Sequence, residues 1–96
     1  MMEMQQVYGV ISPDGQTISG QGFQLRKIRF GLYLVEFERP FAQKPATVCT
    51  ILGNEWQTFN LSIAILEVTP QYFVCSTSSP DRPEDCGFTF IASGQV

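Results

Sequence analysis

The chain of 96 residues contains no histidine, so it lacks the side chain that most often serves as a catalytic acid or base. It also has no Cys-x-x-Cys pair, and no His, Cys or acidic cluster shows metal-ligand spacing. The glycines at 20 and 22 precede an extended segment rather than a helix, unlike a phosphate-binding loop. These absences predict that the protein is not an enzyme and uses no metal or cofactor.

Two groups of acidic residues require a separate interpretation. Glu36 and Glu38 stand two positions apart, the spacing at which two carboxylates can share a pocket, so a hydrolase remains a distant alternative. Two exposed acids on an edge strand are the simpler explanation. The acids between residues 81 and 85 are interrupted by proline and lack EF-hand spacing.

Charge is scarce: six basic and nine acidic residues give a net charge of -3. Nucleic-acid binding is disfavoured because it needs a concentrated basic face. No apolar run approaches the roughly 20 residues of a membrane span, so no membrane insertion is expected. The opening MMEMQQ lacks a signal-peptide pattern, which predicts synthesis in the cytoplasm and a virion-associated or extracellular location after release.

Cysteine is also rare, and the three residues Cys49, Cys75 and Cys86 leave one over in any pairing. Cys75 and Cys86 flank one loop, so a cross-strand disulfide is sterically compatible with the sequence. Without an export signal, three reduced and mostly buried thiols are the favoured interpretation.

What the sequence does have is aromatic and β-branched residues that alternate with polar ones between frequent glycines and prolines. This pattern predicts an all-β fold: a single small antiparallel β-sandwich of six to seven strands over residues 1–96, with residues 1–5 as a disordered N-terminus. Phe41, between two prolines, is expected to fold back into the core, and Phe88 and Phe90 are expected to point inward. The expected extended segments are 6–11, a short piece at 16–19, 23–26, 32–38, 46–52, 58–68, 72–77 and 86–93.

The segment 58–68 is ambiguous because some of its apolar residues and Trp56 fall at helical spacing. Its β-branched residues and the lack of a helix N-cap favour a strand. As a strand it is apolar on both faces, with Leu61, Ile63 and Ile65 on one and Ala64, Leu66 and Val68 on the other. Such a strand is either central or covered by another subunit. The candidate interface residues of a homo-oligomer are Leu61, Ala64 and Leu66.

Several short motifs occur in an order that resembles the H-type lectin domain and the C-terminal lectin-like domains of phage tail fibres. They are Phe37-Glu38-Arg39-Pro40-Phe41, Pro45 before a β-branched strand, Asn60-Leu61-Ser62-Ile63, Val68-Thr69-Pro70 with Phe73, and Phe88-Thr89-Phe90-Ile91-Ala92. The resemblance covers residues 32–93. It implies a six- or seven-stranded sandwich that assembles as a trimer, sometimes a hexamer, and binds sugar between protomers.

The sugar site of the animal lectins in this family is not reproduced in the sequence. Ala64 stands where those lectins have a sugar-binding arginine, and the loop 78–85 lacks their Trp-His pair. The resemblance therefore implies a carbohydrate- or cell-surface-recognition module with a non-standard sugar site. The candidate ligand-binding residues are Asn54, Trp56, Asp81, Arg82 and Asp85, although a rim or core aromatic and a plain solvated loop are the simpler explanations. The alternative is a structural or assembly subunit of a phage or phage-like particle without its own ligand.

Overall fold

A computed structural model describes residues 3–53 and 60–96, and in this part of the chain it contains eight strands and no helix. The predicted all-β sandwich is confirmed, with strands at nearly all the expected positions, but these residues form eight strands rather than the expected six to seven. The strands are β1 (Met4–Ile11), β2 (Thr17–Gln21), β3 (Phe23–Arg29), β4 (Leu32–Phe37), β5 (Ala46–Leu52), β6 (Ser62–Val68), β7 (Tyr72–Ser78) and β8 (Gly87–Gln95).

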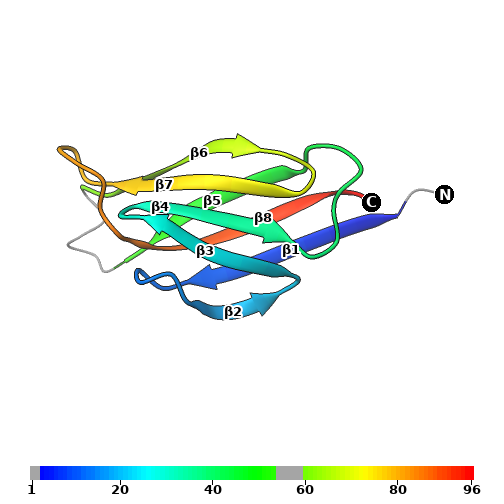
Figure 1. Ribbon diagram of the computed structural model, residues 1–96, viewed down its shortest axis with the longest axis horizontal. Helices are drawn as coiled ribbons and strands as arrows, with labels where there is room; N and C mark the ends of the chain where they lie inside the picture. Colours follow the sequence, from blue (N-terminus) through cyan, green and yellow to red (C-terminus); the bar gives the residue numbers. More distant parts are fainter. Residues whose placement is uncertain (1–2, 54–59) are drawn as a thin grey trace.

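The strands form two antiparallel four-stranded sheets that pack as two layers (Figure 1). Sheet A has the strand order β2-β1-β8-β5, and sheet B has the order β3-β4-β7-β6. Each sheet is covered on one face by the other, so its strands alternate between buried and exposed residues. The turns at 12–16 and 30–31 and the loop 79–86 gather at one end, here called the loop end, and both termini lie at the opposite end (Figure 1).

The core between the sheets is built from aromatic rings that meet edge to face. The rings of Phe23 and Phe73 each lie 5.0 Å from that of Phe90, and Tyr33 lies 5.1 Å from Phe88. Gly9 on β1 leaves room for this cluster, because a Cβ there would come within 2.6 Å of the Phe23 ring. The predicted inward positions of Phe88 and Phe90 are confirmed.

Phe41 is buried in the connection between β4 and β5, as the sequence predicts. Its ring packs 4.9 Å from that of Phe37, and its amide donates a hydrogen bond to the Pro70 carbonyl. The connection, although irregular, therefore contributes a side chain to the core.

The ambiguous segment is a strand from Ser62 to Val68, but it is an edge strand rather than a central one. Ile63 and Ile65 face the core, whereas Ala64 and Leu66 face solvent. The pairing with β7 shifts at Leu66, which has no partner of its own. This β-bulge turns Val68 back toward the core, so the expectation that Val68 shares the outer face with Leu66 was wrong. The first residues of the expected segment, 58–59, lie outside the described residues.

The N-terminal prediction also needs correction over residues 4 and 5. Met4 and Gln5 belong to β1 and pair with Gln95 and Gly94 of β8. The Gln5 side chain also donates a hydrogen bond of 2.9 Å to the Arg39 carbonyl. The terminal strand β8 thus extends far enough to order this part of the chain.

Candidate functional site

The turn between β3 and β4 exposes an aromatic ring at the loop end. The register of β3 with β4 shifts between Lys27 and Arg29, which marks a β-bulge or irregularity in the pairing. Arg29 and Leu32 then pair, which leaves Phe30 and Gly31 as the turn. Gly31 has a φ of 72°, a conformation that glycine adopts without strain. Phe30 is 56% exposed, which is unusual for a phenylalanine in so small a domain.

The loop that leads from β7 to β8 packs against this turn. The buried Thr77 hydroxyl donates to the Glu84 carbonyl over 2.5 Å, and the Thr77 amide donates to the Gly31 carbonyl over 2.8 Å. Within the loop, the Ser79 amide donates to the Arg82 carbonyl over 2.9 Å. These bonds hold the loop residues next to Phe30.

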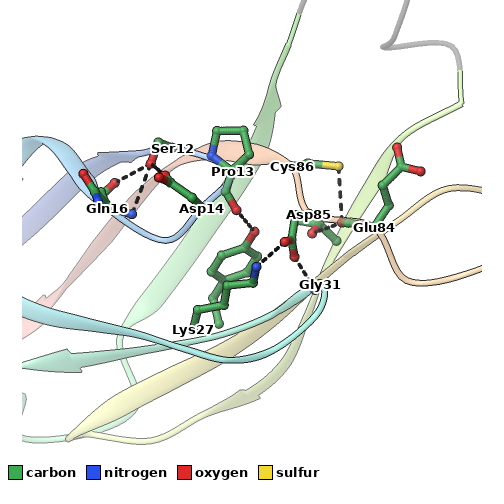
Figure 2. A network of polar contacts seen from close by, with 11 residues as sticks. Ser12, Pro13, Asp14, Gln16, Lys27, Gly31, Glu84, Asp85 and Cys86 are labelled. Carbon is green, nitrogen blue, oxygen red and sulfur yellow. Dashed lines mark hydrogen bonds and ion pairs between the residues drawn. The ribbon is translucent and has the colours of Figure 1, made fainter.

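The Asp85 carboxylate joins the loop to the turn through both of its oxygens. Oδ1 accepts a 2.7 Å hydrogen bond from the Gly31 amide, and Oδ2 forms an ion pair with the Lys27 ammonium. Figure 2 shows the carboxylate between these two groups. Both side chains are partly buried, so the pair is shielded from solvent more than a fully exposed surface salt bridge is.

Lys27 has a second role, because its ammonium nitrogen lies 5.5 Å from the centroid of the Phe30 ring. A cation at this distance is attracted to the ring face. Asp85 therefore fixes Lys27, and Lys27 in turn restrains Phe30. The ring is held in an exposed position by a chain of contacts from the protein interior.

An open cleft of about 490 Å³ lies beside the ring and is lined by Arg29, Phe30, Arg82 and Pro83. The ring and the proline supply flat apolar surface, and the two arginines supply planar donors that remain charged at any physiological pH. Such a cleft can hold a ligand that combines an apolar face with an acceptor or anionic group.

A further hydrogen bond connects the loop end to the core. The Tyr33 hydroxyl donates a 2.7 Å hydrogen bond to the Pro13 carbonyl, which anchors the turn between β1 and β2. Burial raises the pKa of Tyr33 to about 12, and the charge of Asp85 adds to the rise. In the same turn, Ser12 bonds to Asp14 and to Gln16 (Figure 2).

The candidate ligand residues from the sequence have different positions in the structure. Arg82 lines the cleft, whereas Asp85 uses both carboxylate oxygens within the protein. Asp81 is exposed in the same loop and does not line the cleft. Asn54 and Trp56 lie outside the described residues.

Sequence reasoning missed Phe30 and Arg29, which form the other wall of the cleft. The signal that could have found them is the loss of alternation just before Gly31, which marks a turn. An aromatic residue in a turn has few neighbours to bury it.

The candidate interface residues lie on and just before β6. Leu61 is half-buried, Ala64 is exposed, and Leu66 is 60% exposed. Ala64 and Leu66 therefore lie on the outer side of sheet B at its edge, whereas Leu61 precedes the strand. Glu36 is exposed on the outer face of the same sheet, but β4 is an inner strand, so the expectation that the two acids share an edge strand was wrong. Glu38 follows β4 and accepts a 3.2 Å hydrogen bond from Gln24.

The three cysteines are free, with Cys75 and Cys86 buried and Cys49 half-buried. The thiol that contacts Cys75 is that of Cys49: their hydrogen bond, together with burial, raises the pKa of Cys75. Burial also raises the pKa of Cys86. Thiols with raised pKa values are poor nucleophiles at neutral pH.

Within residues 3–53 and 60–96, no group of three or more Cys, Asp or Glu side chains is arranged to hold a metal ion. The same residues include no helix with the length and hydropathy needed to cross a membrane.

Comparison with models of known protein families finds none that matches this chain, and a search of curated proteins finds no similar sequence.

Proposed function

We propose that the protein is a non-enzymatic carbohydrate-recognition module whose binding site is the cleft around Phe30. The observation that carries the proposal is an exposed aromatic ring held beside Arg29 and Arg82. Sugars present flat C–H surfaces that stack on aromatic rings, and their oxygens accept hydrogen bonds from guanidinium groups.

The charge of the cleft points to an acidic sugar. Arginine binds a carboxylate through two parallel hydrogen bonds, and two arginines border the same ring. The Asp85 carboxylate does not compete for the ligand, because its oxygens bond to Lys27 and Gly31. A sugar with a carboxylate group, stacked on Phe30, uses both kinds of surface.

The resemblance to H-type lectin and phage tail-fibre domains supports a recognition role, with a homo-oligomer, a trimer or hexamer, as the active form. A single shallow cleft gives weak binding, and several clefts on one assembly raise the apparent affinity by avidity. The site differs from that of the animal lectins in its side chains, because Arg82 and Pro83 of the loop 79–86 stand in place of their Trp-His pair and the aromatic ring is Phe30 of the turn at 30–31.

A glycan array probed with the intact protein tests the proposal. We expect binding to glycans that end in a carboxylate-bearing sugar, and roughly a tenfold or larger loss with Phe30→Ala or Arg82→Ala. Arg39→Ala is the matched control, because it removes the same charge from a surface ion pair with Glu3, far from the cleft. A blank array, or equal binding by the Phe30→Ala protein, contradicts the proposal.

The second candidate function is a structural or assembly subunit, as in a phage or phage-like particle, without a ligand of its own. The observation that favours it is the absence of charge from all four strands of sheet A. A stable oligomer combined with a blank array supports this candidate over carbohydrate recognition.

A further inference from the structure

The outer face of sheet A carries a row of apolar side chains in direct register. Val48 on β5 pairs with Ile91 on β8, and Ile91 pairs with Tyr8 on β1. All three are well exposed, at 68%, 48% and 54% respectively. Paired side chains on one face lie within contact distance of each other, so the three form one continuous apolar strip across three strands.

The rows on either side of this strip are uncharged and, apart from Val10 and Ala46, polar. Thr50, Thr89 and Val10 form one row, and Ala46, Ser93 and Gln6 form the other. None of the residues in β1, β2, β5 or β8 is acidic or basic. The whole chain has 15 charged residues, so the lack of charge in these four strands sets this face apart from the rest of the protein. An apolar centre with an uncharged polar border is the composition of a protein interface core.

We propose that a second copy of this chain packs against the outer face of sheet A, with the strip of Tyr8, Ile91 and Val48 at the centre of the contact. A nucleic acid or a charged peptide finds no complementary charge on this face. Two copies that meet through the same face bring apolar side chains against apolar side chains and no like charges together.

The dimensions of the face are suitable for this occupant. Four strands of this length span on the order of 20 by 25 Å. Side chains project from this flat area, so the accessible area of the face approaches the roughly 800 Å² that each partner buries in a stable complex. Stacked sheets pack about 10 Å apart, a distance that the side chains of two such faces fill.

The contact differs from the one expected at β6. Ala64 and Leu66 lie on the outer side of an edge strand whose register is broken by a bulge, and Glu67 follows directly. A charge and a bulge are devices that keep edge strands from associating. The proposal does not depend on the binding of a glycan, since the cleft and the strip share no residue.

Sedimentation equilibrium of the intact protein tests the proposal. We expect self-association into pairs, with a mass of twice the 10.8 kDa of one chain, or a hexamer where a three-fold contact is also present. Ile91→Lys and Val48→Lys should weaken this association roughly tenfold or more. Val48→Thr keeps a β-branched side chain of nearly the same shape, and it should shift the equilibrium in the same direction by less.

Leu66→Lys is the matched control, because it places the same charge at an equally exposed leucine of sheet B. It should leave the pairing of two copies through sheet A unchanged. A wild-type protein that stays monomeric at the highest attainable concentration overturns the proposal. So does an oligomer that dissociates with Leu66→Lys but not with Ile91→Lys.

The failure of this proposal and that of the proposed function are distinguishable. The Ile91→Lys protein keeps the cleft, so it should still bind the glycan at a single site with lower avidity. The Phe30→Ala protein should lose the glycan and still associate.

Discussion

The outer faces of the two sheets differ in the charge that they carry. The strands of sheet A contain no charged residue, whereas β3 of sheet B alone contains Arg26, Lys27 and Arg29. Sheet B also carries Glu36 on β4 and Glu67 on β6. Both sheets contribute inward aromatic residues to the same core, so the difference does not arise from folding alone. A charge-free outer face on sheet A alone is what the proposed pairing of two copies through that face predicts.

The loop end and the outer face of sheet A also differ in their polar contacts. At the loop end, Asp85, Lys27 and Gly31 form a partly buried network, and the ring of Phe30 depends on it. The strip on sheet A depends on no such polar network, because its side chains project from regularly paired strands. Substitutions should therefore affect stability at the loop end and association on sheet A.

The largest effect on stability is expected for Gly31→Ala. A Cβ at this position would come within 2.6 Å of the Thr77 carbonyl oxygen, and φ is 72°. We expect a loss of about 3 kcal/mol in the free energy of unfolding, measured by urea denaturation. Gly22→Ala is the control, because φ is 92° there but the nearest atom beyond its chain neighbours, in the Val7 side chain, lies 3.8 Å away. That variant should lose about 1 kcal/mol, and equal losses in both would contradict the packing of the turn on the end of β7.

Asp85→Ala should have the next largest effect, because it leaves the Gly31 amide and the Lys27 ammonium without their partner. We expect a loss of about 2 kcal/mol, together with weaker glycan binding as Lys27 and Phe30 lose their restraint. Asp81→Ala in the same loop removes an exposed carboxylate and should change stability by less than about 0.5 kcal/mol. Thermal and urea unfolding of the two variants would separate these outcomes. An Asp85→Ala protein with unchanged stability would contradict the stabilising role of the network.

Tyr33→Phe should have a smaller effect at neutral pH, about 1 kcal/mol, because one hydrogen bond to Pro13 is lost. The pH dependence is more specific. The unfolded tyrosine ionises near its ordinary pKa of 10.0 and the folded one near 12. The unfolded state thus loses its proton first, and the stability of the wild-type protein should fall as the pH rises from 10 to 12.

Part of that fall should disappear in the Tyr33→Phe protein, as followed by urea denaturation across the pH range. Tyr8→Phe on the face of sheet A is the control and should change stability by less than about 0.5 kcal/mol at neutral pH. An identical pH profile for the wild-type and Tyr33→Phe proteins would show that Tyr33 is not the group responsible.

The sequence was sufficient to predict the sandwich, because alternation along a strand depends only on which face is buried. It also predicted the burial of Phe41, because an aromatic side chain between two prolines has little to pack on except the core. It did not predict the position of Val68, since a bulge at Leu66 shifts the alternation by one residue. A bulge depends on the partner strand, which a local pattern does not identify.

The candidate site was predicted only in part, for a similar reason. The loop around Arg82 could be identified as polar and exposed, but its neighbour Phe30 is 52 positions earlier in the chain. The engagement of Asp85 with Lys27 joins residues 58 positions apart. The charge-free face could not be identified from the sequence either, because only the strand order shows that β1, β2, β5 and β8 belong to one sheet.

The most direct test of the contrast between the two faces is a series of two-dimensional amide NMR spectra at increasing protein concentration. The account predicts chemical-shift changes confined to β1, β8 and β5 around Tyr8, Ile91 and Val48, with the loop end unchanged. Spectra that do not change with concentration, or changes centred on β6 and Leu66, would contradict it.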